Sequence, residues 1–291
     1  MAPRNTGWSG LVTDGHRFGE GERFRTGSWL ERTVVRWRRD GATAAPPILR
    51  RAYEGLLDRL PGDHLVSVMP LGERVRLSAR FRHLSWNREE YHAFRAAVRP
   101  GATVFDVGAN VGAYTLLFAA WAGDRGRVFA FEPAPEALAG LRTHVALNGL
   151  QSRVDIVETA IASSTGRAPF AVHPSGGASS LAVSAVEQAA VVTVPTDTID
   201  NFCAARGVQP DVIKIDVEGA ELEALIGARR TLARPGVEAF VEFHPSVWTV
   251  TGVTRAAVEQ EIHAQGFAAE PLDPAFDIWT TEGVCVRLRR H

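Results

Sequence analysis

Short runs of β-branched and aromatic residues alternate with longer segments of helical periodicity from Thr103 towards the end of the chain. Five runs have the length and composition of buried strands: Thr103–Val107, Arg127–Glu132, Val154–Val157, Val212–Asp216 and Val237–Phe243. The segments between and after them are predicted as helices: Ala113–Trp121, Pro135–Leu147, Asp197–Arg206, Gly219–Gly227 and Thr254–Gln265. Strands that alternate with helices predict an α/β fold with a doubly wound, mostly parallel sheet.

Two further pairs of apolar runs interrupt or follow this alternation. Ala168–Val172 and Val191–Thr196 predict a β insertion on either side of the glycine pair at 176–177. Phe267–Ala269 and Val284–Leu288 predict an antiparallel pair at the edge of the sheet. We therefore expect a sheet that is parallel in its centre and antiparallel at one edge.

The chain before the first predicted strand divides into two parts. Residues 61–100 contain a predicted hairpin, His64–Met69 with Arg74–Phe81, and the predicted helix Arg88–Val98. Residues 1–60 show clear periodicity only at Ile48–Leu60 and are predicted to form a basic extension that is flexible or loosely attached. The main domain is expected to span residues 101–291.

Composition and charge place the chain among soluble globular proteins. Hydrophobic residues make up 45% and charged residues 22% of its 291 residues, which are ordinary values for such proteins. Residues 1–99 hold 18 arginines against 11 acidic residues, so the basic character is concentrated there. A basic segment leaves a nucleic-acid partner open as an alternative.

The sequence indicates neither a membrane-spanning segment nor a disulfide bond. The apolar stretch 113–122 is far shorter than the roughly 18 residues that span a bilayer, and the first 30 residues lack the apolar core of a secretory signal. We therefore expect a cytoplasmic location. Cys203 and Cys285 have no CxxC spacing, so both are expected to be reduced thiols and no zinc site is predicted.

A glycine-rich turn follows the first predicted strand. Gly108 and Gly112 are separated by three residues, and Asp106 precedes them at the end of the strand. The middle glycine of the dinucleotide-binding G-x-G-x-x-G pattern is missing. A carboxylate at this place would repel a pyrophosphate, but it suits the ammonium and sulfonium charges of S-adenosylmethionine. The turn therefore favours the methyl donor over NAD.

Glu132 ends the second predicted strand, where an acidic side chain can accept hydrogen bonds from both ribose hydroxyls. A purely structural role as a helix cap is the alternative. Thr159 and Ala160, after the third strand, fall at the next position along the same edge of the sheet. The predicted cofactor-binding residues are Asp106, Gly108, Ala109, Asn110, Val111, Gly112, Glu132, Pro133, Thr159 and Ala160.

Three segments resemble the FkbM family of methyltransferases: residues 104–112, 129–133 and 213–221, the last being the most family-specific. The similarity runs from about residue 88 to residue 244. The resemblance implies a Rossmann-like fold, S-adenosylmethionine as cofactor and O-methylation of a hydroxyl on a natural product, sugar or glycan.

Four residues are predicted to carry the chemistry. Asp216 and Glu218 end the fourth strand, whereas Glu242 and His244 end the fifth, so all four should meet at the carboxyl edge of the sheet. A hydroxyl needs a base or a metal to become nucleophilic, and these residues can supply either. We favour a metal-free base, with a divalent metal such as magnesium as the alternative. For Glu221, an acid that opposes the dipole of a predicted helix is the favoured interpretation.

Two other functions stay open at this stage. One is a methyltransferase acting on RNA or another nucleic acid, guided by the basic extension; the absence of an N-P-P-Y-type tetrapeptide argues against base N-methylation. The other is a binding protein that keeps the adenosyl pocket without turnover, against which the intact Asp216 and Glu218 pair argues. The favoured partner is a small-molecule or saccharide substrate rather than nucleic acid, and homo-oligomerisation is left open.

Overall fold

The computed structural model describes residues 64–81, 84–173, 179–185 and 190–291. The predicted extension 1–60, with its periodic segment Ile48–Leu60, and the glycine pair at 176–177 lie outside these described residues. No helix among the described residues is both long and apolar enough to cross a membrane.

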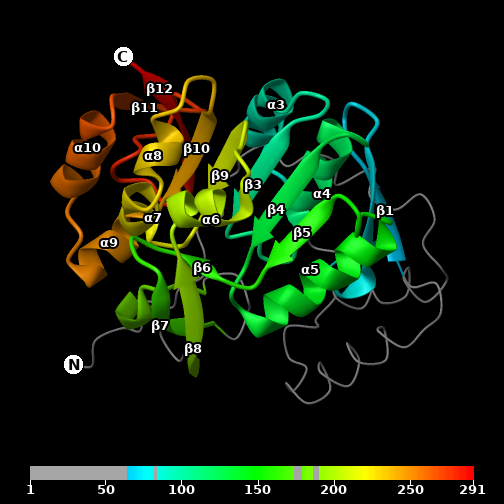
Figure 1. The fold of residues 1–291 in the computed structure, drawn as a ribbon, viewed down its shortest axis with the longest axis horizontal. Coiled ribbons are helices and arrows are strands. Elements are labelled where there is room, and N and C mark those ends of the chain that lie inside the picture. The colour runs from blue at the N-terminus through cyan, green and yellow to red at the C-terminus, as the bar shows by residue number, and fades with distance from the viewer. Residues whose placement is uncertain (1–63, 82–83, 174–178, 186–189) are drawn as a thin grey trace, which may run out of the picture.

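The main sheet has seven strands in the order β11-β12-β10-β9-β3-β4-β5 (Figure 1). Their bounds are β3 Thr103–Val107, β4 Arg127–Phe131, β5 Val154–Val157, β9 Val212–Ile215, β10 Glu238–Phe243, β11 Phe267–Pro271 and β12 Val284–Arg290. The five central strands are parallel, whereas β12 is antiparallel to both of its neighbours. The prediction of a doubly wound, Rossmann-like sheet with an antiparallel edge is confirmed.

Helices cover both faces of this sheet, which explains why its central strands are apolar almost throughout. One face packs against helices α3 (Arg88–Ala97), α4 (Ala113–Ala122) and α5 (Pro135–Leu147). The other face packs against α6 (Ile199–Arg206), α7 (Glu221–Ile226), α8 (Arg229–Leu232), α9 (Pro245–Thr251) and α10 (Arg255–Ala264). Alternate residues of each strand therefore enter two separate cores, as Val104 and Phe105 do.

Local sequence sets where several helices begin. Asn87 caps α3 by accepting from the backbone amides of Glu89 and Glu90, and Thr198 caps α6 in the same way through Asn201. Because Thr198 is the cap, α6 begins two residues later than predicted, and Asp197 belongs to the preceding strand.

Two small sheets accompany the main one. The predicted hairpin is formed by β1 (His64–Val68) and β2 (Arg74–Ser78), and a short 3₁₀ segment, Ala79–Phe81, follows it. The predicted insertion pairs β7 (Gly166–Val172) with β8 (Ala190–Asp197), and β6 (Ala160–Ile161) joins them in the order β6-β8-β7. Strand β6 and helices α8 and α9 were not predicted, because they are too short to show a periodic pattern.

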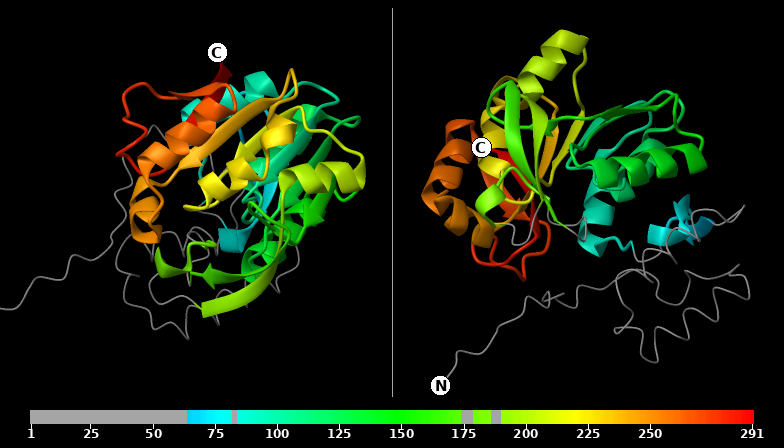
Figure 2. Two further views of the ribbon diagram at one scale, coloured as in Figure 1. Left: turned by 60° about the vertical axis from the view of Figure 1, so that its left-hand side comes forward. Right: turned by 90° about the horizontal axis from the view of Figure 1, so that it is seen from below.

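The chain reverses its direction of travel across the sheet between β3 and β9. From β3 it proceeds to β4 and β5, and it then returns to place β9 and β10 on the other side. Ligands of open α/β sheets bind at such a switch point, beyond the carboxyl ends of the strands. The three-stranded insertion lies at this end of the main sheet (Figures 1 and 2). A ligand site is therefore expected at the loops after β3 and β9.

Candidate active site

The turn after β3 is packed closely against the backbone that leaves β9. Gly108 has a φ of 79°, and a Cβ atom on it would lie 1.7 Å from the carbonyl oxygen of Asp216. The amides of Gly108 and Ala109 both donate to the carbonyl of Phe131, which ties the turn to β4. Glycine is required here because any side chain would push the two loops of the switch point apart.

Glu132 connects the turn to the end of β4. Its carboxylate accepts the amide of Asn110 at 2.8 Å and the amide of Ala134 at 2.8 Å, and the residue is buried. Burial raises the pKa of Glu132 to about 7. A carboxylate has about four lone-pair sites, so two remain for a ligand. The predicted capping role and the predicted ligand role are therefore compatible in one side chain.

A hollow lies between these loops, with about 550 Å³ of space if the open solvent at its mouth is included. Eight of the predicted site residues line it: Gly108, Asn110, Glu132, Pro133, Thr159, Ala160, Asp216 and Glu218. Eight further residues that sequence reasoning missed complete the lining: Val107, Phe131, Ile161, Phe170, Ser179, Leu181, Val217 and Ala220. Phe170, Ser179 and Leu181 come from the insertion, where no local motif marks them.

The remaining cofactor candidates lie behind this surface. Asp106 is buried and accepts the hydroxyl of Thr115 at 2.5 Å, while its other oxygen, Oδ1, has no hydrogen-bond partner among the described residues. Ala109 and Val111 are buried in the turn, and a Cβ on Gly112 would lie 2.6 Å from the Leu141 side chain. These residues shape the turn. Among their side chains, only Asp106 Oδ1 remains able to accept a further hydrogen bond.

Lys214 places a positive charge beneath the site. Its Nζ atom lies 2.9 Å from Asp216 Oδ2 and 4.0 Å from Asp106 Oδ1, and its side chain is only 4% exposed. Burial opposes ionisation of Asp216, but the Lys214 ammonium outweighs it and holds the pKa of this carboxyl below its usual value. Lys214 is the only lysine of the chain, and no role was predicted for it from the sequence. A lysine inside an otherwise buried strand is the signal that marks it as paired.

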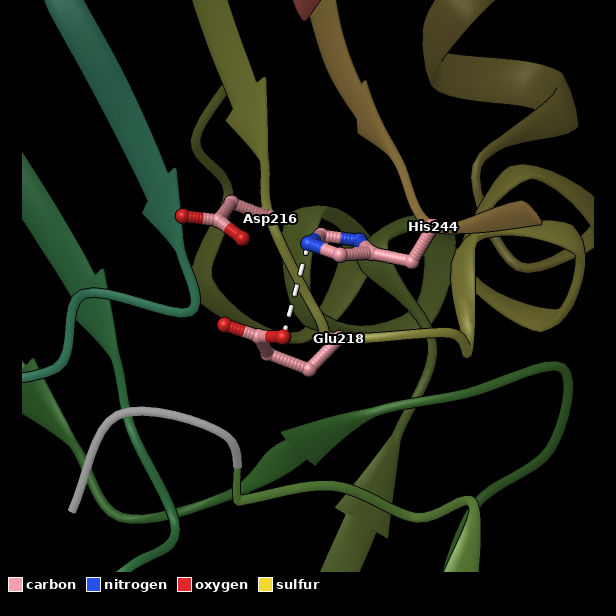
Figure 3. A group of neighbouring side chains, drawn as sticks. All are labelled: Asp216, Glu218 and His244. Carbon is pink, nitrogen blue, oxygen red and sulfur yellow. Dashed lines mark ion pairs between the residues drawn. The ribbon is translucent and has the colours of Figure 1, made fainter. Parts of the chain in front are cut away.

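Glu218 stands on a strained turn after β9. Its φ of 51° is rare for a residue with a side chain, and such outliers gather at functional sites. Its carboxylate faces Asp216 and His244 (Figure 3). Burial raises the pKa of Glu218 to about 7, with the ionised Asp216 adding to the effect against the attraction of His244.

His244 reaches the same cluster from the end of β10. Its Nε2 atom lies 3.4 Å from Glu218 Oε2 (Figure 3) and 3.9 Å from Glu242 Oε1. Its Nδ1 atom lies 2.8 Å from Glu221 Oε1. Burial disfavours the imidazolium, but Glu221 and the neighbouring carboxylates outweigh it and raise the pKa of His244 well above its usual value. His244 is therefore a cation at neutral pH.

Glu221 lies in the first turn of α7, as predicted, but it does more than oppose the helix dipole. The residue has no exposed surface, and its carboxylate accepts the Trp248 indole N–H at 2.5 Å and the Gly219 amide at 2.7 Å. Together with the contact to His244, these bonds make Glu221 the group that fixes the imidazole. Local sequence places an acid at the start of α7, but only the fold brings α9 and β10 against it.

Glu242 contacts Asp216 but does not line the hollow. Burial and the neighbouring charge of Asp216 raise the pKa of Glu242 well above its usual value, and its carboxyl hydrogen-bonds to Asp216. A protonated Glu242 therefore donates to an ionised Asp216. All four predicted catalytic residues thus meet in one cluster, although Glu242 and His244 do not line the hollow.

Three members of the cluster have the spacing of metal ligands. Asp216, Glu218 and His244 can each offer one atom within 4.8 Å of the others. A hard divalent cation could use the two carboxylates. However, Lys214 already places a positive charge among these acids, and His244 could bind a cation only as a neutral imidazole.

The fold defines a Rossmann-like α/β protein with a hollow at the switch point of its sheet. Residues 106–268, more than half of the chain, match the model of the methyltransferase FkbM domain. The chain belongs to this family, and the resemblance predicted from residues 104–112, 129–133 and 213–221 is confirmed.

Two relatives are named as O-methyltransferases or methyltransferases. The chain is 29% identical over 154 residues to the 2-O-methyltransferase NoeI of Sinorhizobium fredii, covering 47% of this chain and 61% of that protein. It is 38% identical over 97 residues to the 31-O-demethyl-FK506 methyltransferase FkbM of Streptomyces tacrolimicus, covering 33% of this chain and 35% of that protein. The matches therefore span less than two thirds of either relative.

Solved structures with a similar arrangement were also found. A methyltransferase FkbM from Methylobacillus flagellatus is 17% identical, with a TM-score of 0.44, over 69% of this chain and 50% of that one. A fibrillarin from Aeropyrum pernix, solved with S-adenosyl-L-methionine, is 13% identical, with a TM-score of 0.41, over 78% of this chain and 94% of that one.

Proposed function

We propose that this protein transfers a methyl group from S-adenosylmethionine to a hydroxyl of a small natural product, sugar or glycan. One observation carries the proposal: the glycine turn and Glu132 face Asp216 and Glu218 across a single hollow at the switch point of the sheet. Family membership supports methyl transfer, and the names of both relatives describe transfer to an oxygen atom.

The residues of the hollow suit the cofactor. Gly108 lets the loop after β3 pack against the Asp216 backbone, so that both loops line one hollow, and the free lone pairs of Glu132 suit the two ribose hydroxyls. Ile161, Phe170 and Leu181 give an apolar wall that fits adenine. When bound, S-adenosylmethionine supplies an electrophilic methyl group on a positively charged sulfur.

The chemical step needs a group that accepts the hydroxyl proton. The acceptor oxygen forms a bond to the methyl carbon as the carbon–sulfur bond breaks, which gives a methyl ether and S-adenosylhomocysteine. We assign Glu218 as the base that accepts this proton. Its pKa of about 7 suits a base that works near neutral pH, and its side chain is 31% exposed. Asp216 is a weaker base because Lys214 keeps its pKa low, while His244 is already protonated.

Replacing the base tests this assignment. Glu218→Gln should lower kcat by about 10²- to 10⁴-fold, the usual contribution of a positioned base, with little change in cofactor affinity. Glu223→Gln, which alters an exposed acid nearby on α7, is the matched control and should keep the wild-type rate. An unchanged rate in Glu218→Gln would remove Glu218 from the mechanism.

Chelation separates the base from the metal alternative. EDTA should leave the wild-type rate intact, because the base needs no cation. Loss of activity that added magnesium restores would instead assign Asp216, Glu218 and His244 to a metal.

Titration calorimetry tests the cofactor itself. The protein should bind S-adenosylmethionine and S-adenosylhomocysteine but not NAD. Binding of NAD alone would overturn the proposal, whereas cofactor binding without transfer to any hydroxyl would favour the non-catalytic alternative.

A further inference from the structure

A second, larger hollow opens beside the first. It measures about 930 Å³ if the open solvent at its mouth is included, and it lies where α3 begins and β12 starts, on the α3 side of the main sheet. Its lining comprises Ser85, Trp86, Asn87, Glu89, Glu90, Leu272, Asp273, Phe276, Thr281, Glu282, Gly283, Val284 and Cys285. We refer to it as the α3–β12 cavity.

Glu242 joins this cavity to the reacting cluster. It pairs directly with Cys285 across β10 and β12, and a Cβ on Gly283 would lie 3.1 Å from its Oε1 atom. Both Cys285 and Gly283 line the cavity. On its other side Glu242 hydrogen-bonds to Asp216, which lines the first hollow. Glu242 therefore borders the α3–β12 cavity, and its partner Asp216 borders the first hollow, so the reacting cluster is within reach of both.

The wall of the α3–β12 cavity is acidic. Four acidic residues line it, Glu89, Glu90, Asp273 and Glu282, and none of the described residues in its lining is Arg, Lys or His. An anion placed a few ångströms from such side chains is repelled by kilocalories per mole in a partly buried setting. Phosphate and carboxylate groups therefore do not suit this cavity, and a polyanionic nucleic acid suits it least.

The rest of the wall combines flat apolar surface with short polar groups. Trp86, Leu272 and Phe276 give the apolar part, and Ser85, Asn87 and Thr281 lie among them. The Trp86 ring is held in place because its indole N–H donates to the Ala113 carbonyl at 3.0 Å. A fixed aromatic ring beside hydroxyl and carboxylate groups suits a molecule that has apolar faces and a hydroxyl-rich edge.

We propose that the α3–β12 cavity is the acceptor site and that it selects uncharged or amine-bearing saccharides over phosphorylated or carboxylated ones. This inference rests on the proposed methyl transfer. It places the acceptor on the Glu242 side of the reacting cluster, with its hydroxyl reaching Glu218 and the methyl group in the first hollow, and makes Glu89 and Asp273 determinants of charge selectivity.

The test measures methyl transfer from labelled S-adenosylmethionine to defined probes. The probes are maltotriose, glucosamine, glucuronic acid and glucose 6-phosphate. The wild type should prefer the first two by about tenfold or more in kcat/KM. Glu89→Lys and Asp273→Lys should each lower kcat/KM for glucosamine by about tenfold and raise it for glucose 6-phosphate.

Two controls keep the result interpretable. Glu259→Lys makes the same charge change on α10, at a side chain 41% exposed and outside both hollows, and should leave the preference unchanged. Glu89→Gln and Asp273→Asn are milder variants in case either lysine variant fails to fold, and they should reduce the preference for the amine-bearing probe.

The failure of this inference and of the proposed function are distinguishable. If the protein binds S-adenosylmethionine but methylates none of the probes, or accepts the anionic probes equally well, the acceptor assignment is wrong. The same holds if the Glu89 and Asp273 variants behave like Glu259→Lys. If the protein does not bind S-adenosylmethionine at all, the proposed function fails first.

Discussion

Glu132 illustrates how one side chain can serve the fold and a ligand at once. Two of its acceptor positions hold the backbone of the glycine turn and of the entry to α5, and the others face the hollow. Its burial is costly for a carboxylate, which is why its pKa rises to about 7. Ribose hydroxyls would stabilise the charged form.

Replacing Glu132 should therefore weaken cofactor binding. Glu132→Ala is expected to reduce the affinity for S-adenosylmethionine by about 1–3 kcal/mol, through lost hydrogen bonds at a buried site. Titration calorimetry measures this, with Glu136→Ala, an exposed acid in the first turn of α5, as the control. Equal affinities in the two variants would show that Glu132 only holds the turn.

A second prediction at this scale concerns pH. A base must be deprotonated to work, and burial raises the pKa of Glu218 to about 7. The value of kcat/KM, which reports groups of the free enzyme, should therefore rise as pH rises through about 7 and level off above it. In Glu218→Gln the residual rate should lose this rise, and a profile that keeps it would assign the titration to another group.

At the scale of elements, the loops after β3 and β9 pack closely against each other at the switch point of the sheet. Gly108→Ala should cost about 3 kcal/mol or more of unfolding free energy, because its Cβ would overlap the Asp216 carbonyl. Gly149→Ala has a similar positive φ of 65° but open space around it, so it should cost only about 1 kcal/mol. Denaturant unfolding compares the two, and equal losses would show that the loops can separate freely.

The contact of α7 with β10 and α9 depends on Glu221. Glu221→Ala would leave the buried His244 and the Trp248 indole without their acceptor, and it should destabilise the fold by about 3–5 kcal/mol. Glu259→Ala, which removes an exposed ion pair within α10, should change stability by less than about 1 kcal/mol. A Glu221→Ala loss as small as the control would contradict the role assigned to this carboxylate.

For the whole molecule, the described residues that line the cofactor hollow all lie between Val107 and Ala220. Removal of the residues before Ile48 should therefore leave the affinity for S-adenosylmethionine nearly unchanged, as calorimetry on the shortened chain can show. We propose that the basic extension 1–60 tunes substrate recognition or association. A large loss of cofactor affinity in a folded, shortened chain would contradict this division.

The sequence by itself determined the features that depend on near neighbours. Strand β3, helix α5 and strand β5 were predicted to the residue, because apolar period and flanking turn residues act locally. The glycine turn, Glu132 and the carboxylates after β9 were found for the same reason, since each follows a recognisable strand at a fixed spacing.

Only the tertiary structure decided which of these groups act on one another. Strand order brings Lys214 between Asp106 and Asp216, and helix packing buries Glu221 against His244 and Trp248. The α3–β12 cavity joins residues 200 positions apart, from Ser85 to Cys285. Charge balance, pKa shifts and cavity shape depend on distances in space, which a local pattern along the chain does not contain.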